Sequence, residues 1–388
     1  MAAVSKSMAS DATSVEIRVV KTAADWDLFL DLPTQLYHHD PNWVAPLRSS
    51  VVKQLSPDSL TARYCQFQPF LALRDRQPVG RIVAAVNQRL LERESQAVGL
   101  FGYFESIDDE AVSGVLLEAA CGWLRERKMS VVRGPIDLST HNSCFFLVDG
   151  FASPPVVMMP YNPAYYPDLI EKAGWQKAKD AYAYDFPLLN HVLSDQFERG
   201  YRVACKSGIT FRPIHVKGKG FDQDCRSLYR IFSESFRGSW SSTPRTEEEF
   251  LEEAKELRSL VDPDIFPVAE DNGKMIGFWM GLPNYNTVLK RVNGKLDWLG
   301  ILKFLWYRRQ IDQGRVIAIC SLPEYRRKMV PLALIHLGMQ GGIRKGKPYK
   351  RAELSWVWED NMPSRKLIEA AGGTIYKIYR IYEKPLRC

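Results

Sequence analysis

The sequence predicts an α/β fold of the α+β kind, in which two mixed-sheet units are related by an internal duplication. Strand-like and helix-like segments alternate in both halves of the 388-residue chain, which is long enough to give each half its own core. Four landmarks of the first half recur in the second half in similar local contexts. The pairs are Trp43 and Trp240, Gly80 and Gly277, Asn162 and Asn361, and Gly174 and Gly372, which lie 197, 197, 199 and 198 residues apart. This nearly constant spacing indicates a duplicated unit.

The elements of the first half follow from their apolar patterns. Residues 15–19, VEIRV, alternate as a half-buried strand does. The polar run Asp75-Arg76-Gln77-Pro78 separates two apolar runs, so it predicts the turn of a hairpin. Asp108-Asp109-Glu110 places negative charge where the dipole of a following helix favours it. The expected strands are residues 15–19, 70–73, 79–86, 97–104 and 128–133, and the expected helices are residues 25–30 and 108–127.

The two units differ in their insertions. The first has an additional segment between Arg133 and Asn162, which can reach over a groove or build the interface between the units. The predicted organisation is a disordered N-terminus at 1–14, a first unit at 15–190, a second unit at 207–388, and an insertion at 283–313 within the second unit.

The composition limits the functional classes. Hydrophobic residues make up 46% and charged residues 25% of the chain, as in ordinary globular proteins. Seven scattered cysteines form no C-x-x-C pair, so we expect neither a metal site nor a disulfide framework, and a reducing cytoplasm fits. No window reaches the ~20 apolar residues of a membrane span, and residues 1–14 lack the apolar core of a secretory signal. We therefore expect a cytoplasmic protein, with peripheral contact to the inner membrane left open.

A net charge of +7 suggests an anionic partner, which can be CoA, acidic lipid headgroups or RNA. The stretch 315–342 contains a candidate binding site for an anion. Residues 316–320 form a β-branched apolar run, typical of a buried strand, and a helix begins near Pro331. Between them the turn carries Arg326, Arg327 and Lys328. A helix N-terminus beside three cations predicts a phosphate site, and a solvated basic turn is the alternative.

The strand, the turn P-E-Y-R-R-K and the helix resemble the acyl-CoA-binding segment of the GNAT superfamily of N-acetyltransferases. In the superfamily pattern, Arg/Gln-x-x-Gly-x-Gly/Ala, Arg326 takes the first position, and Met329 and Pro331 take the glycine positions. The first half has the acidic run 105–109 at the corresponding place. The resemblance therefore implies two GNAT-like domains, with acyl-CoA bound only by the second. It assigns cofactor contacts to Cys320, Ser321, Arg326, Arg327, Lys328 and Asn361.

Residues 351–359 form an alternating strand that would place Glu353 and Glu359 on one side and Leu354, Trp356 and Trp358 on the other. In the GNAT pattern this strand splays from the cofactor strand and leaves backbone free to hold the acyl thioester. A carboxylate there can accept the proton of the attacking amine, so Glu353 is our first candidate for the base and Glu359 our second. The tyrosine that often protonates the leaving thiolate is replaced by Ile368, and Tyr325 is a possible substitute.

The apolar helix expected at 298–309 ends in two arginines, Arg308 and Arg309. It can be buried in the core, which is the commonest outcome, line a hydrophobic channel, or lie on a membrane surface. The resemblance also implies that residues 233–242 cover the acceptor. The candidate substrate contacts are Phe236, Trp240, Trp298, Leu302 and Leu305.

The tandem arrangement and the segments ELSW and YRIYEK look like a bacterial group of double-GNAT proteins that is similar to ceramide-synthase-type N-acyltransferases of lipid metabolism. The resemblance implies transfer of a long acyl chain from acyl-CoA to a sphingoid or other lipid amine. Three alternatives stay open: a small-molecule N-acetyltransferase, a Fem-type transferase that depends on aminoacyl-tRNA, and a non-catalytic acyl-CoA-binding protein. We expect no nucleic-acid partner, because no basic and aromatic tract suited to RNA stacking is present.

Overall fold

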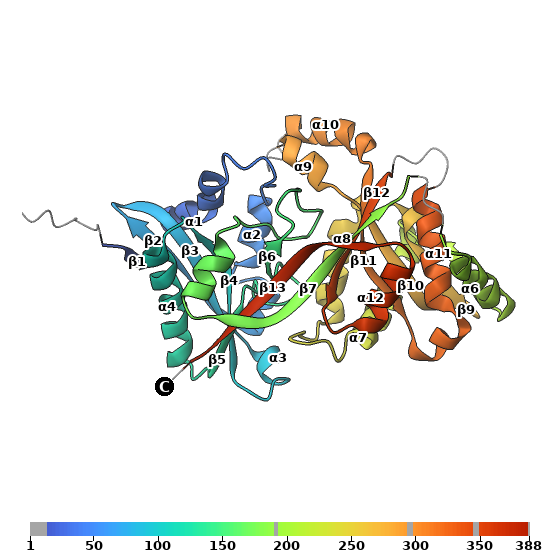
Figure 1. Ribbon diagram of the computed structural model, residues 1–388, viewed down its shortest axis with the longest axis horizontal. Helices are drawn as coiled ribbons and strands as arrows, with labels where there is room; N and C mark the ends of the chain where they lie inside the picture. The colour runs from blue at the N-terminus through green and yellow to red at the C-terminus, as the bar shows by residue number, and fades with distance from the viewer. Residues whose placement is uncertain (1–13, 190–192, 293–297, 344–348, 387–388) are drawn as a thin grey trace, which may run out of the picture.

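The computed structural model describes residues 14–189, 193–292, 298–343 and 349–386 (Figure 1). The predicted disordered N-terminus therefore lies, except for Ser14, outside the described residues. Two lobes lie side by side, and the long strands β7 and β13 cross the middle of the molecule between them (Figure 1). The elements expected from the sequence are present in both lobes.

The strands of the first half are β1 (Glu16–Val19), β2 (Cys65–Arg74), β3 (Gln77–Asn87), β4 (Val98–Ser106), β5 (Val131–Gly134), β6 (Phe146–Asp149) and β7 (Gln176–Pro187). Its helices are α1 (Ala23–Leu36), α2 (Arg48–Gln54), α3 (Gln88–Leu91), α4 (Glu110–Glu126) and α5 (Tyr166–Lys172). The predicted acidic start of α4 is confirmed, because Asp109 caps this helix by accepting hydrogen bonds from the backbone of Ala111 and Val112.

The strands of the second half are β8 (Thr210–Pro213), β9 (Pro267–Asp271), β10 (Lys274–Pro283), β11 (Gln313–Ser321), β12 (Arg351–Trp358) and β13 (Thr374–Pro385). Its helices are α6 (Asp195–Lys206), α7 (Gly218–Ser235), α8 (Glu247–Leu257), α9 (Asn286–Val292), α10 (Trp298–Tyr307), α11 (Val330–Ile343) and α12 (Met362–Ala370). A short 3₁₀ turn, Pro323–Lys328, joins β11 to α11.

One continuous mixed sheet runs through both halves in the order β1-β2-β3-β4-β5-β13-β7-β12-β11-β10-β9-β8, and β6 pairs with β13 beside this path. The C-terminal strand β13 lies between β5 and β7 of the first half. Strand β7 in turn pairs with β12 of the second half. Each half therefore completes its sheet with a strand from the other half, and the duplication is held together by backbone hydrogen bonds.

Helices cover both faces of the sheet, as neighbouring strand residues show. In β10, Trp279 packs against α11, whereas Phe278 packs against α7 on the opposite face. In the first half, Phe70 faces α4 and Leu71 faces α1. Because successive strand residues point to opposite faces, each run of apolar residues fills two cores at once.

Candidate functional site

The parallel strands β11 and β12 form a fork. They pair only from Gln313 with Arg351 to Val316 with Leu354. Beyond that point β11 continues along β10, and β12 continues along β7. The predicted splay is thus confirmed, and the edge of β11 that faces β12 has no strand partner from Ile317 onward. A β-bulge at Ile317, one residue without a counterpart on β10, lies where the fork opens.

The corresponding fork of the first half is closed by the chain itself. Strands β4 and β5 pair only from Val98 to Leu100, and the segment after β5 then covers the free edge of β4. The backbone N–H of Ile136 donates to the carbonyl of Phe101 at 2.7 Å, and Asp137 accepts from the N–H of Tyr103 at 2.7 Å. Among the residues that the structure describes, no backbone hydrogen bond reaches the free edge of β11. Within the described residues, the fork of the second half thus keeps a strand edge free of backbone hydrogen bonds, whereas that of the first half does not.

The turn between β11 and α11 keeps a glycine-like shape without glycine. Met329, at the first glycine position of the superfamily pattern, has a φ of 61°, in the left-handed region. This conformation costs a residue with a side chain roughly 1–2 kcal/mol of free energy, yet the backbone turns as it would with glycine. The loss of glycine in the sequence therefore does not remove the turn that leads into α11.

Two of the three predicted phosphate-binding cations are available. Arg326 and Arg327 are exposed, and neither guanidinium forms an ion pair or hydrogen bond with any residue that the structure describes. The ammonium of Lys328 lies 3.4 Å from Asp271 and 5.0 Å above the ring of Tyr325. Burial and the Asp271 carboxylate raise the pKa of Tyr325, so this side chain is neutral at pH 7. An anion at the loop would therefore meet Arg326 and Arg327 first.

A buried polar cluster lies directly before the fork. Glu353 on β12 is 1% exposed and lies opposite Arg315 on β11. Its Oε2 accepts a hydrogen bond from the hydroxyl of Tyr376, and its Oε1 has no partner within the described structure. Arg315 donates to Ser355 Oγ at 3.1 Å and to the carbonyl of Val157 at 2.8 Å. Burial lowers the pKa of Arg315, and the neighbouring Glu353 carboxylate opposes this shift.

Strand β13 adds three side chains to this cluster that the sequence analysis missed. Besides Tyr376, the buried ammonium of Lys377 donates to the carbonyls of Ser153 and Pro154 at 3.1 and 2.9 Å, and burial lowers the pKa of Lys377 to about 8. The buried hydroxyl of Tyr379 makes no hydrogen bond in the described residues. No spacing in the sequence could reveal these neighbours, because β13 reaches them by pairing within the first half.

Glu359 does not accompany Glu353, so the prediction that they share one side of the strand was wrong. Leu354 pairs with Tyr184 and Val357 with Tyr182, which leaves one extra residue on β12. This bulge reverses the alternation, and Trp356 and Trp358 consequently pack in the core on the Glu353 face. The carboxylate of Glu359 instead accepts from Lys177 Nζ at 2.7 Å and from the backbone of Asp180 at 3.1 Å.

The remaining predicted cofactor residues lie around the ends of β11 and β12. Cys320 and Ser321 are buried at the end of β11, and burial raises the pKa of the Cys320 thiol to about 12. Asn361 caps α12 by accepting from the backbone of Ser364 at 3.3 Å. This bond accounts for Asn361 as a helix cap and leaves its predicted contact with the cofactor untested.

The two predicted acceptor-wall aromatics lie apart in the structure. Phe236 packs on Phe232 with their ring centroids 4.6 Å apart, as residues four positions apart on a helix do. Trp240 meets the edge of Trp358 at 5.3 Å and lies under the guanidinium of Arg133 at 4.3 Å. Trp240 thus contacts both halves on the Glu353 face of the sheet.

Helix α10 is not buried, so core burial, the commonest outcome for such a helix, does not apply. The side chains of Trp298, Leu302 and Leu305 are 70%, 57% and 47% exposed. Phe304 attaches the helix to the protein by stacking on Tyr285 at 5.6 Å. Helix α10 lies at the top of the molecule in Figure 1, and its apolar side chains are exposed.

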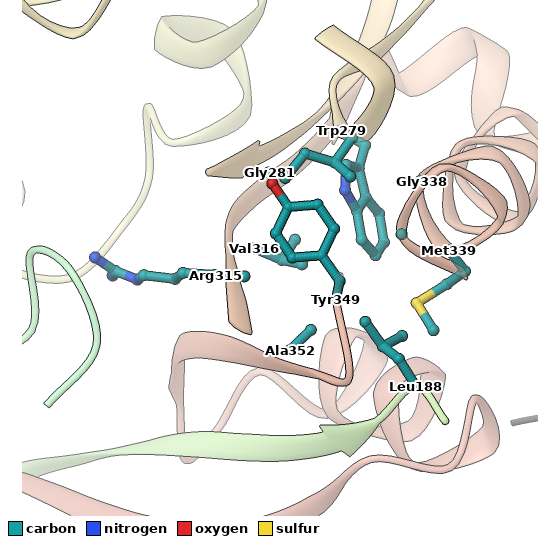
Figure 2. A pocket seen from close by; sticks show the side chains of 12 residues that line it. Leu188, Trp279, Gly281, Arg315, Val316, Gly338, Met339, Tyr349 and Ala352 are labelled. Carbon is teal, nitrogen blue, oxygen red and sulfur yellow. The ribbon is translucent and has the colours of Figure 1, made fainter. Parts of the chain in front are cut away.

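A cavity of about 30 Å³ lies beside the fork, between β10, β11 and α11 (Figure 2). Trp279, Met339 and Tyr349 enclose it, whereas Arg315 extends away from it (Figure 2). This volume holds about one water molecule. This cavity is therefore too small for an acyl chain or for CoA.

No family model matches the sequence. The chain is 32% identical to the "Bacterial ceramide synthase" of Caulobacter vibrioides (strain NA1000 / CB15N), over 98% of this chain and 100% of that protein. It is 29% identical to "Protein YghO" of Escherichia coli (strain K12), over 95% of each chain.

Solved structures with a similar fold include a tandem GNAT protein from the clavulanic acid biosynthesis pathway, with a TM-score of 0.58 and 10% identity. The alignment covers 97% of this chain and 99% of that one. A GCN5-related N-acetyltransferase from Sphaerobacter thermophilus aligns over 96% of both chains, with a TM-score of 0.52 and 15% identity. The predicted tandem fold is confirmed over nearly the whole chain.

Proposed function

The chain belongs to the bacterial ceramide synthase family of GNAT-fold acyltransferases, and we propose that it transfers a long acyl chain from acyl-CoA to the amine of a lipid acceptor, such as a sphingoid base. The observation that carries this proposal is the open fork of the second half, which leads to a loop with two arginines whose guanidinium groups form no ion pair with a described residue. The name of the Caulobacter relative supports the choice of acceptor, because a ceramide contains an N-acylated sphingoid base.

In this proposal the phosphates of CoA lie at Arg326 and Arg327, and the acyl thioester enters the fork. The free backbone edge of β11 supplies N–H groups for the thioester oxygen, which gains negative charge as the amine attacks. The amine nitrogen bonds to the carbonyl carbon, the carbon–sulfur bond breaks, and CoA leaves as a thiolate. Tyr325 stays a candidate for protonating that thiolate, although its neighbours in the structure are Asp271 and Lys328.

An attacking amine has to lose a proton, and Glu353 is the carboxylate that we propose to accept it. It lies one residue before the fork opens, and its Oε1 has no partner within the described structure. The proton can pass directly or through one water molecule. The hydroxyl of Tyr376 then holds the carboxylate in a fixed orientation.

Replacing Glu353 with glutamine should lower kcat at pH 7 by about tenfold or more and change the Kd for acyl-CoA little. The loss should shrink as the pH rises, because the free amine then deprotonates without help. Steady-state kinetics from pH 7 to 10 measure both effects. Glu359→Gln is a matched control, since Glu359 lies on the other face of β12 and should keep the wild-type pH profile. An unchanged kcat in a folded Glu353→Gln enzyme would assign the base to another residue.

We also propose that α10 brings the enzyme to a membrane surface. Its outward stripe consists of Trp298, Ile301, Leu302, Leu305 and Trp306. Lys303, Arg308 and Arg309 are exposed beside this stripe, and the sequence from Trp298 to Ile311 contains no acidic residue. Apolar side chains flanked by cations fit the surface of an anionic bilayer. No helix in the described ranges is long and apolar enough to span a membrane.

Leu302→Ser combined with Leu305→Ser should reduce binding to vesicles that contain anionic phospholipid by at least tenfold, because each buried leucine contributes roughly 1.5–3 kcal/mol. Cosedimentation with phosphatidylglycerol vesicles measures the partition. The matched control is Val203→Ser with Ile375→Ser, two exposed apolar residues outside α10. Equal binding of the α10 variant and the wild type would exclude α10 as the contact, and activity on a soluble short-chain amine should be unaffected.

A further inference from the structure

A large space lies between the two halves, and one of its lining residues, Phe145, packs against Trp356 beside the open fork with ring centroids 5.1 Å apart. This groove has a volume of about 1490 Å³, above the roughly 300–1,000 Å³ of common ligand pockets. Its floor is formed by Tyr103 and Glu105 of β4 and by Asp137 in the loop after β5, and helices α2 and α8 lie along it. Neither of these two helices has a buried side chain. The space beneath them is therefore not filled by the protein's own residues.

Ion pairs hold the two helices together across the halves. Lys53 of α2 pairs with Glu252 and Glu256 of α8. Arg63, shortly after α2, pairs with Glu248 at 3.1 Å. Such exposed pairs are weak, so a ligand can separate α2 from α8 at a small cost in free energy. Access to the groove thus does not require a change in either core.

The groove presents an apolar wall as well as a polar floor. Its apolar lining includes Val51, Met159, Leu257 and Leu289. Met158 also lines the groove, and its side chain is 47% exposed and so is not part of the hydrophobic core. Apolar side chains that face an enclosed but unfilled space gain free energy when a hydrocarbon chain covers them.

The polar floor contains one carboxylate with unused capacity. Glu105 accepts hydrogen bonds from the hydroxyls of Tyr37 at 2.9 Å and Tyr166 at 2.7 Å, and Arg81 lies 3.5 Å away. Asp137 accepts only from the backbone of Tyr103, through Oδ1, and its other oxygen has no partner within the described residues. Asp137 is partly exposed to the groove. A cation there would gain an ion pair in a largely enclosed site.

The geometry points to this groove as a second ligand site, for a long-chain amphiphile whose protonated amine binds Asp137 and whose chain lies along Met158 and Leu257. Burial raises the pKa of Asp137 to about 7, with Glu105 adding to the shift and Arg81 opposing it, and a bound ammonium would favour the ionised carboxylate. Because Ile136 and Asp137 close the first-half fork, this site can bind an amine but leaves no free strand edge for a thioester. Binding here does not depend on acyl transfer.

Calorimetric titration with dodecylamine below its micellar concentration tests the site in the full-length protein. We expect saturable binding that Asp137→Asn weakens at least tenfold, since asparagine still accepts the Tyr103 bond but lacks the charge. Dodecanol and dodecanoate should bind at least tenfold more weakly than dodecylamine. The control Asp149→Asn, at an exposed aspartate outside the groove, should bind as the wild type does.

Met158→Asp provides an independent test, because the side chain is exposed and its replacement should spare the fold while weakening dodecylamine binding at least fivefold. The combined variant Arg326→Ala, Arg327→Ala should still bind the amine, which separates this site from the CoA site. Equal affinity of Asp137→Asn and wild type, or equal binding of dodecanoate and dodecylamine, would overturn the assignment. Unchanged dodecylamine binding by Met158→Asp would overturn the placement of the hydrocarbon chain along Met158.

Discussion

Replacing Arg326 and Arg327 together with alanine is expected to weaken CoA binding by about a hundredfold or more. Each charge-assisted hydrogen bond to a phosphate contributes roughly 1.5–3 kcal/mol, so two of them give at least about 3 kcal/mol. Both guanidinium groups are exposed and form no ion pair with a described residue, so no competing carboxylate has to be displaced. Isothermal titration of the purified variants with CoA measures the loss.

Lys328→Ala and the pair Arg308→Ala with Arg309→Ala are the matched controls. Lys328 already faces Asp271 at 3.4 Å, so its removal should cost less than that of either arginine. Arg308 and Arg309 are equally exposed cations, but they follow α10 and lie at no strand-to-helix turn. If CoA affinity fell by the same factor for each removed positive charge, whichever residue carried it, the placement of the phosphates at Arg326 and Arg327 would be contradicted.

The sequence was sufficient for the parts of the fold that local patterns determine. The apolar run at 316–320 and the helix from Pro331 appear as β11 and α11, because a strand and a helix impose different periods on the chain. The duplication predicted two copies of one α/β unit. Both halves contain a fork between parallel strands, although their strands join into one sheet. Asp108-Asp109-Glu110 also predicted correctly that α4 begins with acidic residues.

Non-local pairing decided what the sequence could not reveal. A single extra residue in β12 moved Glu359 to the opposite face, and alternation alone cannot locate such a bulge. Lys377 and Tyr379 reach the Glu353 cluster because β13 crosses into the first half, a step that no residue pattern in β13 announces. Closure of the first-half fork by Ile136 likewise depends on a loop that folds back onto β4.

Met329 illustrates a third kind of limit. Glycine most easily lets a loop bring its backbone close to a phosphate, and here Met329 and Pro331 take the glycine positions. The structure keeps the left-handed conformation at Met329, where the 3₁₀ turn ends and α11 begins. The residue type determines how much free energy such a backbone conformation costs. Whether the conformation occurs depends on the tertiary packing around it.

Palmitoyl-CoA should be used at least a hundredfold better than acetyl-CoA, as judged by kcat/KM with one long-chain amine acceptor. Around the open fork, Ile317, Ile319 and Trp356 are only partly buried and leave apolar surface that an acyl chain can cover. Each buried methylene contributes roughly 0.8 kcal/mol, so covering four of the fourteen additional methylenes gives about 3 kcal/mol, or about two hundredfold. Acetyl-, octanoyl- and palmitoyl-CoA, assayed without vesicles, separate chain burial from membrane binding.

Two sets of variants decide where the chain lies. The sequence suggested Leu302 and Leu305 as its wall, but both are exposed on α10, so Leu302→Ser with Leu305→Ser should leave the donor preference intact in solution. Ile319→Asn, beside the fork, should reduce the preference for palmitoyl over acetyl by about tenfold, because it removes apolar surface where the chain would pass. If only the α10 variant lost the preference for palmitoyl over acetyl, the acyl chain would instead lie against α10. Equal kcat/KM values for acetyl and palmitoyl donors in the wild type would instead favour a small-molecule N-acetyltransferase, since an enzyme that buries no chain gains nothing from its length.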